Sequence, residues 1–124
     1  MDKVLRENLL APYLEPITIG GIRYFRGLPW DTLRELIENH LVEMGPWNEC
    51  PGVAKAFGPF MARYPGYQAH GYVVDAGRPD ARITVEGIEK TSRLTREEII
   101  SFVVMFKGAD DLQIADDYAC CWYD

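Results

Sequence analysis

Three pairs of short β-forming segments, each pair interrupted by a turn sequence, constrain the fold of this 124-residue chain more than any other feature. Gly20-Gly21 interrupts the first pair, and two adjacent glycines supply the positive φ angles that a tight hairpin turn requires. The turn-forming sequence DAGRPD interrupts the second pair, and Asp116-Asp117 interrupts the third. The sequence therefore predicts three antiparallel hairpins. Their strands are 16–19 with 22–26, 67–74 with 81–88, and 111–115 with 118–123.

Helical periodicity is clearest between the first two hairpins. Side chains recur there at the spacing of one helix face, at Leu33, Leu36, Ile37, His40, Leu41 and Met44. This stripe predicts a helix that begins at Pro29 or Asp31 and ends at Gly45-Pro46. A shorter helix is expected over residues 2–11.

Two further helices are expected later in the chain. Residues 52–64 carry a second apolar stripe, but Gly58-Pro59 interrupts it and predicts a kink or two short helices. The last helix has a capping box, in which Thr95 caps the helix and Glu98 reaches back to its amide. Its predicted buried stripe and its end are Ile99, Phe102, Val103, Phe106 and then Gly108.

The resulting order is αββααββαββ, without the regular alternation of parallel β–α–β units. Such an order is typical of an α+β protein. We therefore expect one domain over residues 1–124, with an antiparallel sheet built from hairpins and about four helices packed on one face. A chain of this length buries roughly two-thirds of the surface of its unfolded form, enough for a core without disulfides or metal.

The cysteine content and the chain hydropathy bear on location. An odd number of cysteines, three, with no framework spacing is typical of a reducing compartment. The sequence contains no signal peptide pattern and no run of about 20 apolar residues that would span a bilayer. We expect a cytoplasmic protein with no membrane contact.

The net charge indicates which classes of partner the protein is expected to bind. Nineteen acidic residues against thirteen basic residues leave a net charge of −6, concentrated late in the chain. An acidic surface repels phosphate backbones, so we expect no nucleic acid partner. It favours a basic protein or a cationic ligand.

Strand alternation defines a candidate binding surface on the second hairpin. Ile83 and Val85 point to one side with Ala69, Gly71 and Val73, and small residues there would let a helix approach closely. The opposite side is polar but includes an aromatic ring and a histidine. Its candidate binding residues are His70, Tyr72, Arg82, Thr84 and Glu86. The alternative is an ordinary solvated face of an antiparallel sheet.

A catalytic site is not indicated. His70 and Glu86 are expected to pair across the hairpin, and a carboxylate can orient a histidine as a general base. However, the chain has only two serines, Ser92 and Ser101, and no G-x-S-x-G sequence, so no nucleophile accompanies this pair. We predict no catalytic residue and no cofactor, while the question of an enzyme stays open.

A second candidate site lies between the sheet and the helices. His40 and Trp47 are its candidate binding residues, with Trp30 and Tyr64 as further walls of a pocket. His40 is also consistent with a neutral core residue that is hydrogen-bonded to the backbone, and this is the interpretation we favour. Cys50 precedes a predicted helix and is either a reactive thiolate or, as we favour, a small packing residue.

The last hairpin contains adjacent cysteines and five aspartates. Cys120 and Cys121 point to opposite faces of a strand, which excludes a shared zinc site, and the aspartates lack the calcium-loop pattern. We therefore predict no metal. A three-residue loop would bury Tyr118, Cys120 and Trp122, whereas a two-residue loop would bury Ala119, Cys121 and Tyr123. We favour the three-residue loop because it buries the tryptophan.

These observations support two hypotheses of function. The first is a non-catalytic protein–protein interaction module, either an inhibitor or immunity-like protein that neutralises a basic partner, or a homodimer or larger homo-oligomer. The alternative is a small-molecule-binding protein or small enzyme with a pocket between the sheet and the helices.

Overall fold

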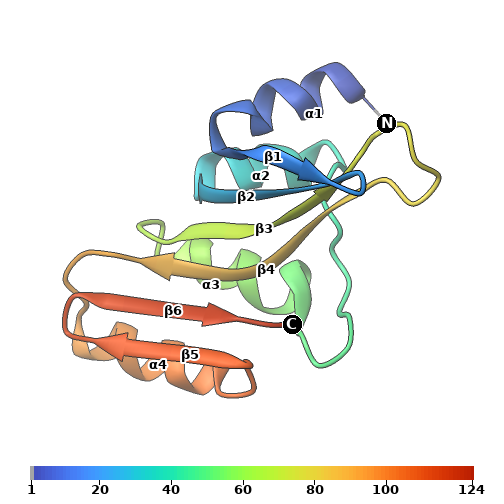
Figure 1. Ribbon diagram of the computed structural model, residues 1–124. Coiled ribbons are helices and arrows are strands. Elements are labelled where there is room, and N and C mark those ends of the chain that lie inside the picture. The colour runs from blue at the N-terminus through green and yellow to red at the C-terminus, as the bar shows by residue number, and fades with distance from the viewer. Residues whose placement is uncertain (1) are drawn as a thin grey trace.

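The computed structural model describes residues 2–124, and its strands form one six-stranded antiparallel sheet (Figure 1). The strands are β1 (Leu14–Ile19), β2 (Ile22–Pro29), β3 (Gln68–Val74), β4 (Arg82–Lys90), β5 (Asp111–Ala115) and β6 (Tyr118–Trp122). Their order across the sheet is β1-β2-β3-β4-β6-β5. All three predicted hairpins are present, as β1–β2, β3–β4 and β5–β6.

Four α-helices accompany the sheet within residues 2–124. They are α1 (Lys3–Leu10), α2 (Trp30–Glu38), α3 (Gly58–Arg63) and α4 (Arg96–Phe106). Figure 1 shows α2, α3 and α4 behind one face of the sheet, with α1 over the end formed by β1 and β2. The predicted α+β order is therefore confirmed. No helix in residues 2–124 combines the length and the apolar character that crossing a membrane requires.

Local sequence signals determine where two of these helices begin. The capping box at α4 is present, since the Thr95 hydroxyl accepts from the Glu98 amide and the Glu98 carboxylate accepts from the Thr95 amide. The expected interruption at Gly58-Pro59 is also present, because a π-helical turn (Val53–Phe57) ends where α3 begins. In both cases the signal acts within one turn of helix.

The helix α2 is shorter than its apolar stripe predicts, and His40 lies outside it. The helix ends at Glu38; the His40 amide then donates to the Ile37 carbonyl and the Leu41 amide to the Leu36 carbonyl. This pair of bonds is a Schellman motif, in which His40 takes the left-handed conformation with φ of 55°. His40 is exposed, so the prediction of a buried core histidine is wrong. The apolar stripe continues in the sequence beyond Glu38, but the backbone leaves the helical conformation before His40.

The predicted three-residue loop of the last hairpin is wrong. Ala115 pairs with Tyr118, so the loop is Asp116-Asp117, and Ala119, Cys121 and Tyr123 are buried. Trp122 remains 37 % exposed on the other side. The side of β6 that faces the helices thus carries the small side chains of Ala119 and Cys121 and then the ring of Tyr123, which meets Phe57 edge to face.

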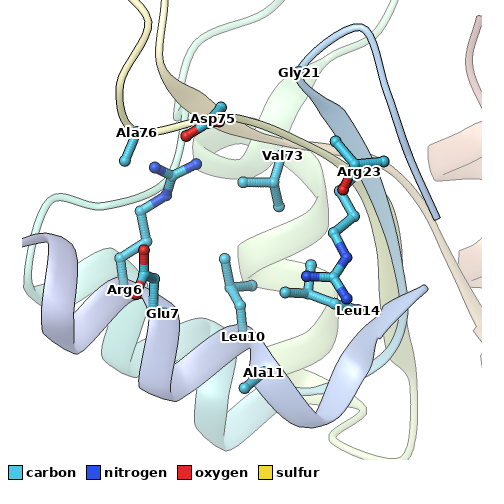
Figure 2. A pocket seen from close by; sticks show the side chains of 11 residues that line it. Arg6, Glu7, Leu10, Ala11, Leu14, Gly21, Arg23, Val73, Asp75 and Ala76 are labelled. Carbon is cyan, nitrogen blue, oxygen red and sulfur yellow. The ribbon is translucent and has the colours of Figure 1, made fainter. Parts of the chain in front are cut away.

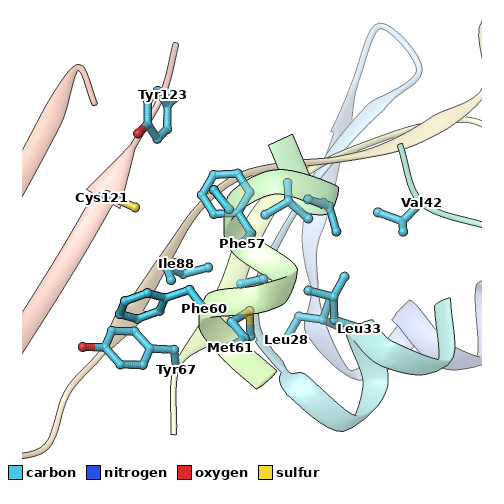
Figure 3. Close-up of a cluster of buried hydrophobic side chains, with 14 of the residues drawn as sticks. Leu28, Leu33, Val42, Phe57, Phe60, Met61, Tyr67, Ile88, Cys121 and Tyr123 are labelled. Carbon is cyan, nitrogen blue, oxygen red and sulfur yellow. The ribbon is translucent and has the colours of Figure 1, made fainter. Parts of the chain in front are cut away.

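A cluster of aromatic rings fills the space between the sheet and the helices α3 and α4, and Figure 3 shows three of its members, Phe57, Phe60 and Tyr67. The cluster comprises Phe57, Phe60, Tyr67, Phe102 and Phe106, all buried. Neighbouring rings stack or meet edge to face, with centroids 5.0 Å apart for Phe60 and Tyr67 and 5.6 Å apart for Phe57 and Phe106. This helix-covered side of the sheet, which we call the covered face, is a packed core.

A β-bulge reorients the end of β4. His70 pairs with Gly87 but Gly71 pairs with Val85, so Glu86 has no partner residue on β3. The extra residue places Ile88 in the core and Glu89 on the opposite side of the sheet. Gly87 is required at this point, because a Cβ atom there would lie 1.9 Å from the carbonyl oxygen of Cys121.

Candidate functional site

The side of the sheet opposite the helices is bare of helices within residues 2–124, and we call it the open face (Figure 1). Strand pairing aligns Tyr24, Tyr72 and Thr84 across three neighbouring strands on this side. The residues of the open face are Ile17, Ile19, Tyr24, Arg26, His70, Tyr72, Arg82, Thr84, Glu86, Glu89, Cys120 and Trp122. The face thus combines strands of all three hairpins, with β1 at its edge.

Large apolar side chains are exposed on the open face. Ile17 is 68 % exposed, Ile19 71 %, Tyr24 52 % and Trp122 37 %. The rings of Tyr24 and Tyr72 meet edge to face with centroids 6.4 Å apart. A solvated strand face normally carries polar side chains, so this apolar surface needs another explanation.

An ion pair lies at the centre of the open face. The Arg26 guanidinium donates to both carboxylate oxygens of Glu89, at 2.8 and 3.1 Å. These hydrogen bonds hold the pKa of Glu89 below its usual value, and its carboxylate is buried while Arg26 is exposed. Paired in this way, the two charges form a fixed and nearly neutral centre.

His70 and Glu86 both reach the open face but do not form the predicted pair. Because of the bulge, His70 lies opposite Gly87, and no hydrogen bond or ion pair joins it to Glu86 within residues 2–124. Burial lowers the pKa of His70, which favours a neutral imidazole near neutral pH. The side chain of Glu86 instead accepts a hydrogen bond from Trp122.

Glu86 has an unusual electrostatic environment. Burial raises its pKa to about 7, and the nearby carboxylate of Asp124 adds to this shift. The carboxyl lines a hollow of about 250 Å³ on the open face. The walls of this hollow are Glu15, Tyr24, Phe25, Arg26, His70, Gly71, Glu86, Glu89, Cys120 and Trp122. A carboxyl held next to another acid in a hollow is suited to accept a cationic group.

The other predicted residues of the second hairpin lie on the same face. The Arg82 guanidinium donates to the Tyr72 hydroxyl at 3.2 Å and lies 5.5 Å from the centroid of its ring. Thr84 is 2 % exposed, and its buried hydroxyl oxygen has no hydrogen-bond partner. Four of the five hairpin residues are thus half-buried on the open face, whereas Thr84 is buried.

The structure brings one residue of the second candidate site, His40, close to a hairpin residue. His40 and Arg82 both line a hollow of about 160 Å³, separate from the hollow beside Glu86. Trp47 lies in a loop, where its backbone exchanges two hydrogen bonds with Cys50. Burial raises the pKa of the Cys50 thiol, which opposes a reactive thiolate. Trp30, Trp47 and Tyr64 are absent from the walls of the three main hollows along residues 2–124.

The largest of these hollows is a site that the sequence pattern does not indicate. It has a volume of about 370 Å³ and lies between α1, the β1–β2 hairpin and the end of β3 (Figure 2). Its walls are Arg6, Glu7, Leu10, Ala11, Leu14, Thr18, Gly21, Arg23, Val73, Asp75 and Ala76. We call it the α1 hollow. No spacing in the sequence joins α1 to β3, so only the tertiary structure reveals it.

Neither a metal site nor similarity to known proteins indicates what chemistry this protein performs. Residues 2–124 contain no group of three or more His, Cys, Asp or Glu side chains arranged to hold a metal ion. No family model, curated protein or solved structure matches the chain. The function therefore has to be argued from the side chains of the open face and the α1 hollow.

Proposed function

We propose that the protein is a non-catalytic binding module that contacts another protein through its open face. The observation that carries this proposal is the exposure of Ile17, Ile19, Tyr24 and Trp122 on a sheet face with no helix over it. Aromatic side chains and arginine are the residues that dominate binding energy at protein interfaces, and Tyr24, Trp122 and Arg26 are of these types.

The charges of the open face favour a partner with a basic side chain. Ionised Glu86 is destabilised by burial and by Asp124, and a lysine or arginine in the adjacent hollow would relieve both effects. The chain also carries a net charge of −6, which attracts a basic protein over a distance. This is the charge pattern expected of an inhibitor or immunity-like protein.

A peptide selection tests this proposal. Random peptides displayed on phage are selected against the wild-type protein, and the affinities of enriched peptides are measured by isothermal calorimetry. We expect a basic residue flanked by apolar residues, with binding weakened at least about ten-fold by Tyr24→Ser or Glu86→Gln. The control Val4→Ser, an exposed apolar position on α1, should bind as the wild type does. Peptides that bind Tyr24→Ser with unchanged affinity would contradict the proposal.

Self-association is a second form of this function, and α4 supports it. Besides its buried stripe, α4 exposes Ile100, Val103, Val104 and Met105, by 54, 39, 67 and 40 %. Val103 was expected in the core and is instead part of this exposed set. From Ile99 to Phe106 every side chain of α4 except Ser101 is apolar, and a helix of this kind is normally buried, so we propose that α4 packs against α4 of a second copy.

The ends of α4 suit an antiparallel pair. Glu97, whose carboxylate accepts a hydrogen bond from Arg63 of the same copy, lies in the first turn of α4, and Lys107 follows its last residue. Antiparallel packing therefore brings Lys107 of each copy near this acidic end of the other. Sedimentation velocity should show a dimer that Val104→Glu converts to a monomer, while Tyr24→Ser leaves it intact. A wild-type monomer at all concentrations would contradict self-association.

We also propose two points that are independent of these surfaces. The first is a cytoplasmic location, supported by three free cysteines, two of them buried. Fractionation of the source cells tests it, and recovery of the protein from the medium would contradict it. The second is small-molecule binding as an additional function, supported by the volume of the α1 hollow, which lies in the range of ligand sites.

A further inference from the structure

The α1 hollow has a cationic end at Arg23. The Arg23 Nε donates to the Glu15 carbonyl oxygen at 2.5 Å, and no carboxylate within residues 2–124 forms an ion pair with this guanidinium. Figure 2 shows the guanidinium beside Leu14, at one side of the hollow. Its Nε bond fixes the side chain, and its terminal nitrogens remain to donate to an anion.

The middle of the hollow is apolar. Leu10, Leu14 and Val73 line it from α1, β1 and β3, and Figure 2 shows Leu10 and Val73 between the two arginines. Leu10 is 2 % exposed, so this floor belongs to the core and is held in place by it. A ligand bound here would cover apolar surface in a preformed site.

The opposite end has a different charge balance. The Arg6 guanidinium donates to the Val74 carbonyl oxygen at 2.5 Å. The negative charges of Asp75 and Glu7 lie close enough to favour the protonated form of this guanidinium. Figure 2 shows Asp75 and Glu7 on the Arg6 side of the hollow, away from Arg23. Two carboxylates therefore outweigh one guanidinium there, whereas Arg23 is the only charge at its own end among the lining residues.

We propose that the α1 hollow binds a small organic acid whose carboxylate pairs with Arg23 and whose apolar body covers Leu10, Leu14 and Val73. A carboxylate matches the planar fork of a guanidinium, and the acidic Arg6 end excludes a second anionic group from the far side. The ligand is thus a monocarboxylate, and an amine at its far end is compatible with Asp75 and Glu7. This inference rests on the proposed small-molecule function.

Three probes with one apolar body and different head groups test the inference. They are 4-phenylbutyrate, 4-phenylbutanol and 4-phenylbutylamine, each titrated into ¹⁵N-labelled protein and followed by amide chemical shifts. We expect 4-phenylbutyrate to shift the amides of Leu10, Leu14, Arg23 and Val73 and to bind at least about ten-fold more tightly than the alcohol. The amine should bind more weakly than the acid.

Substitutions of Arg23 then test whether this residue contacts the head group of the ligand. Arg23→Gln should weaken 4-phenylbutyrate about ten-fold and bring it to the level of the alcohol, while Arg23→Lys retains part of the difference. The control Arg34→Gln, an exposed arginine on α2, should leave all three affinities unchanged.

The possible outcomes distinguish a failure of the proposed ligand class from a failure of the proposed small-molecule function. If the alcohol or the amine binds in the α1 hollow as tightly as the acid, the monocarboxylate proposal is overturned while small-molecule binding stands. If Arg23→Gln leaves the affinity for the acid unchanged, the proposed head-group contact is wrong. If no probe shifts the amides that line the hollow, small-molecule binding at this site is itself rejected.

Discussion

The two faces of the sheet carry apolar side chains of similar size in very different surroundings. On the covered face, Phe57, Phe102 and Phe106 are fully buried among other rings. On the open face, Ile19 and Tyr24 are more than half exposed. The side chains on the covered face contribute to stability by leaving water, whereas those on the open face gain this free energy only when something covers them.

This difference means that residue type alone does not show what a position contributes. Each face also carries an ion pair with a buried carboxylate: Lys90 with Glu98 on the covered face and Arg26 with Glu89 on the open face, both at 2.8 Å. If the open face serves binding, its residues should affect the free energy of unfolding little, and those of the covered face should affect it strongly.

The largest expected effect is at Phe102. Phe102→Ala leaves a cavity in the aromatic cluster and should lower the free energy of unfolding by about 3 to 5 kcal/mol, measured by denaturant titration. Its counterpart Tyr24→Ala should lower it by less than about 1 kcal/mol. Equal losses at the two positions would show that the open face is part of the stabilising core, and the distinction between the faces would fail.

The two ion pairs give the next largest contrast. Glu98 is 3 % exposed, so Lys90→Ala leaves a buried carboxylate without its cation and should cost about 3 kcal/mol. Glu89 is also buried, but its cation is exposed and its carboxylate lines a hollow of the open face, so removal of the Arg26 side chain opens it to solvent; Arg26→Ala should therefore cost less, about 1 kcal/mol. The same denaturant titration measures both variants at pH 7. A larger loss for Arg26→Ala than for Lys90→Ala would reverse the expected order.

The pH dependence of Glu86 separates binding from stability within the open face. Its pKa is about 7 in the folded protein and near 4.5 in the unfolded chain, so the folded state binds the extra proton. The protonated carboxyl therefore stabilises the protein at low pH, and this contribution is lost as the pH rises from about 4.5 through 7. Glu86→Gln should be about 1 to 2 kcal/mol more stable than the wild type at pH 8, after allowance for partial solvent screening.

The same pair of proteins should have nearly equal stability at pH 4, because Glu86 is then largely protonated in both the folded and the unfolded states. Thermal unfolding at the two pH values measures the change. Equal stability of the variant and the wild type at pH 8 would mean that Glu86 ionises without cost, and the argument for a basic partner would lose its electrostatic support.

The smallest expected effect is at His40, which follows the end of α2 and lies outside both faces of the sheet. This residue holds a left-handed conformation that favours glycine, with φ of 55°. His40→Gly should raise the free energy of unfolding by up to about 1 kcal/mol. A loss of stability instead would show that the exposed imidazole makes a contribution larger than its backbone strain.

Local signals were sufficient for most of the fold. Gly20-Gly21 marks the first hairpin, Gly58-Pro59 divides the helical segment, and Thr95 with Glu98 starts α4, because each of these signals acts between residues close in the chain. The alternation of β3 and β4 also placed His70, Tyr72, Arg82 and Glu86 on the correct side of the sheet. Each of these predictions depends only on the periodicity of side chains along one element or on the residues of one turn.

The errors arose where distant segments decide between local alternatives. A shift of one residue in the last hairpin exchanges Cys121 for Trp122 in the core, and only the space left by the aromatic cluster selects between them. The bulge at Glu86 separates it from His70, and its position depends on the approach of Cys121 to Gly87. The apolar stripe through His40 also continues past the point where the helix ends.

The sequence by itself determined the order of the elements, the antiparallel hairpins and the side of the sheet that carries the second hairpin's polar residues. These follow from turn chemistry and side-chain periodicity, which act over a few residues. The tertiary structure alone decided which side chains of β6 are buried, where the open face is hollowed, and that Arg6 and Arg23 lie across one hollow. Those outcomes depend on how much space distant segments leave for one another, and that space exists only after the chain has packed.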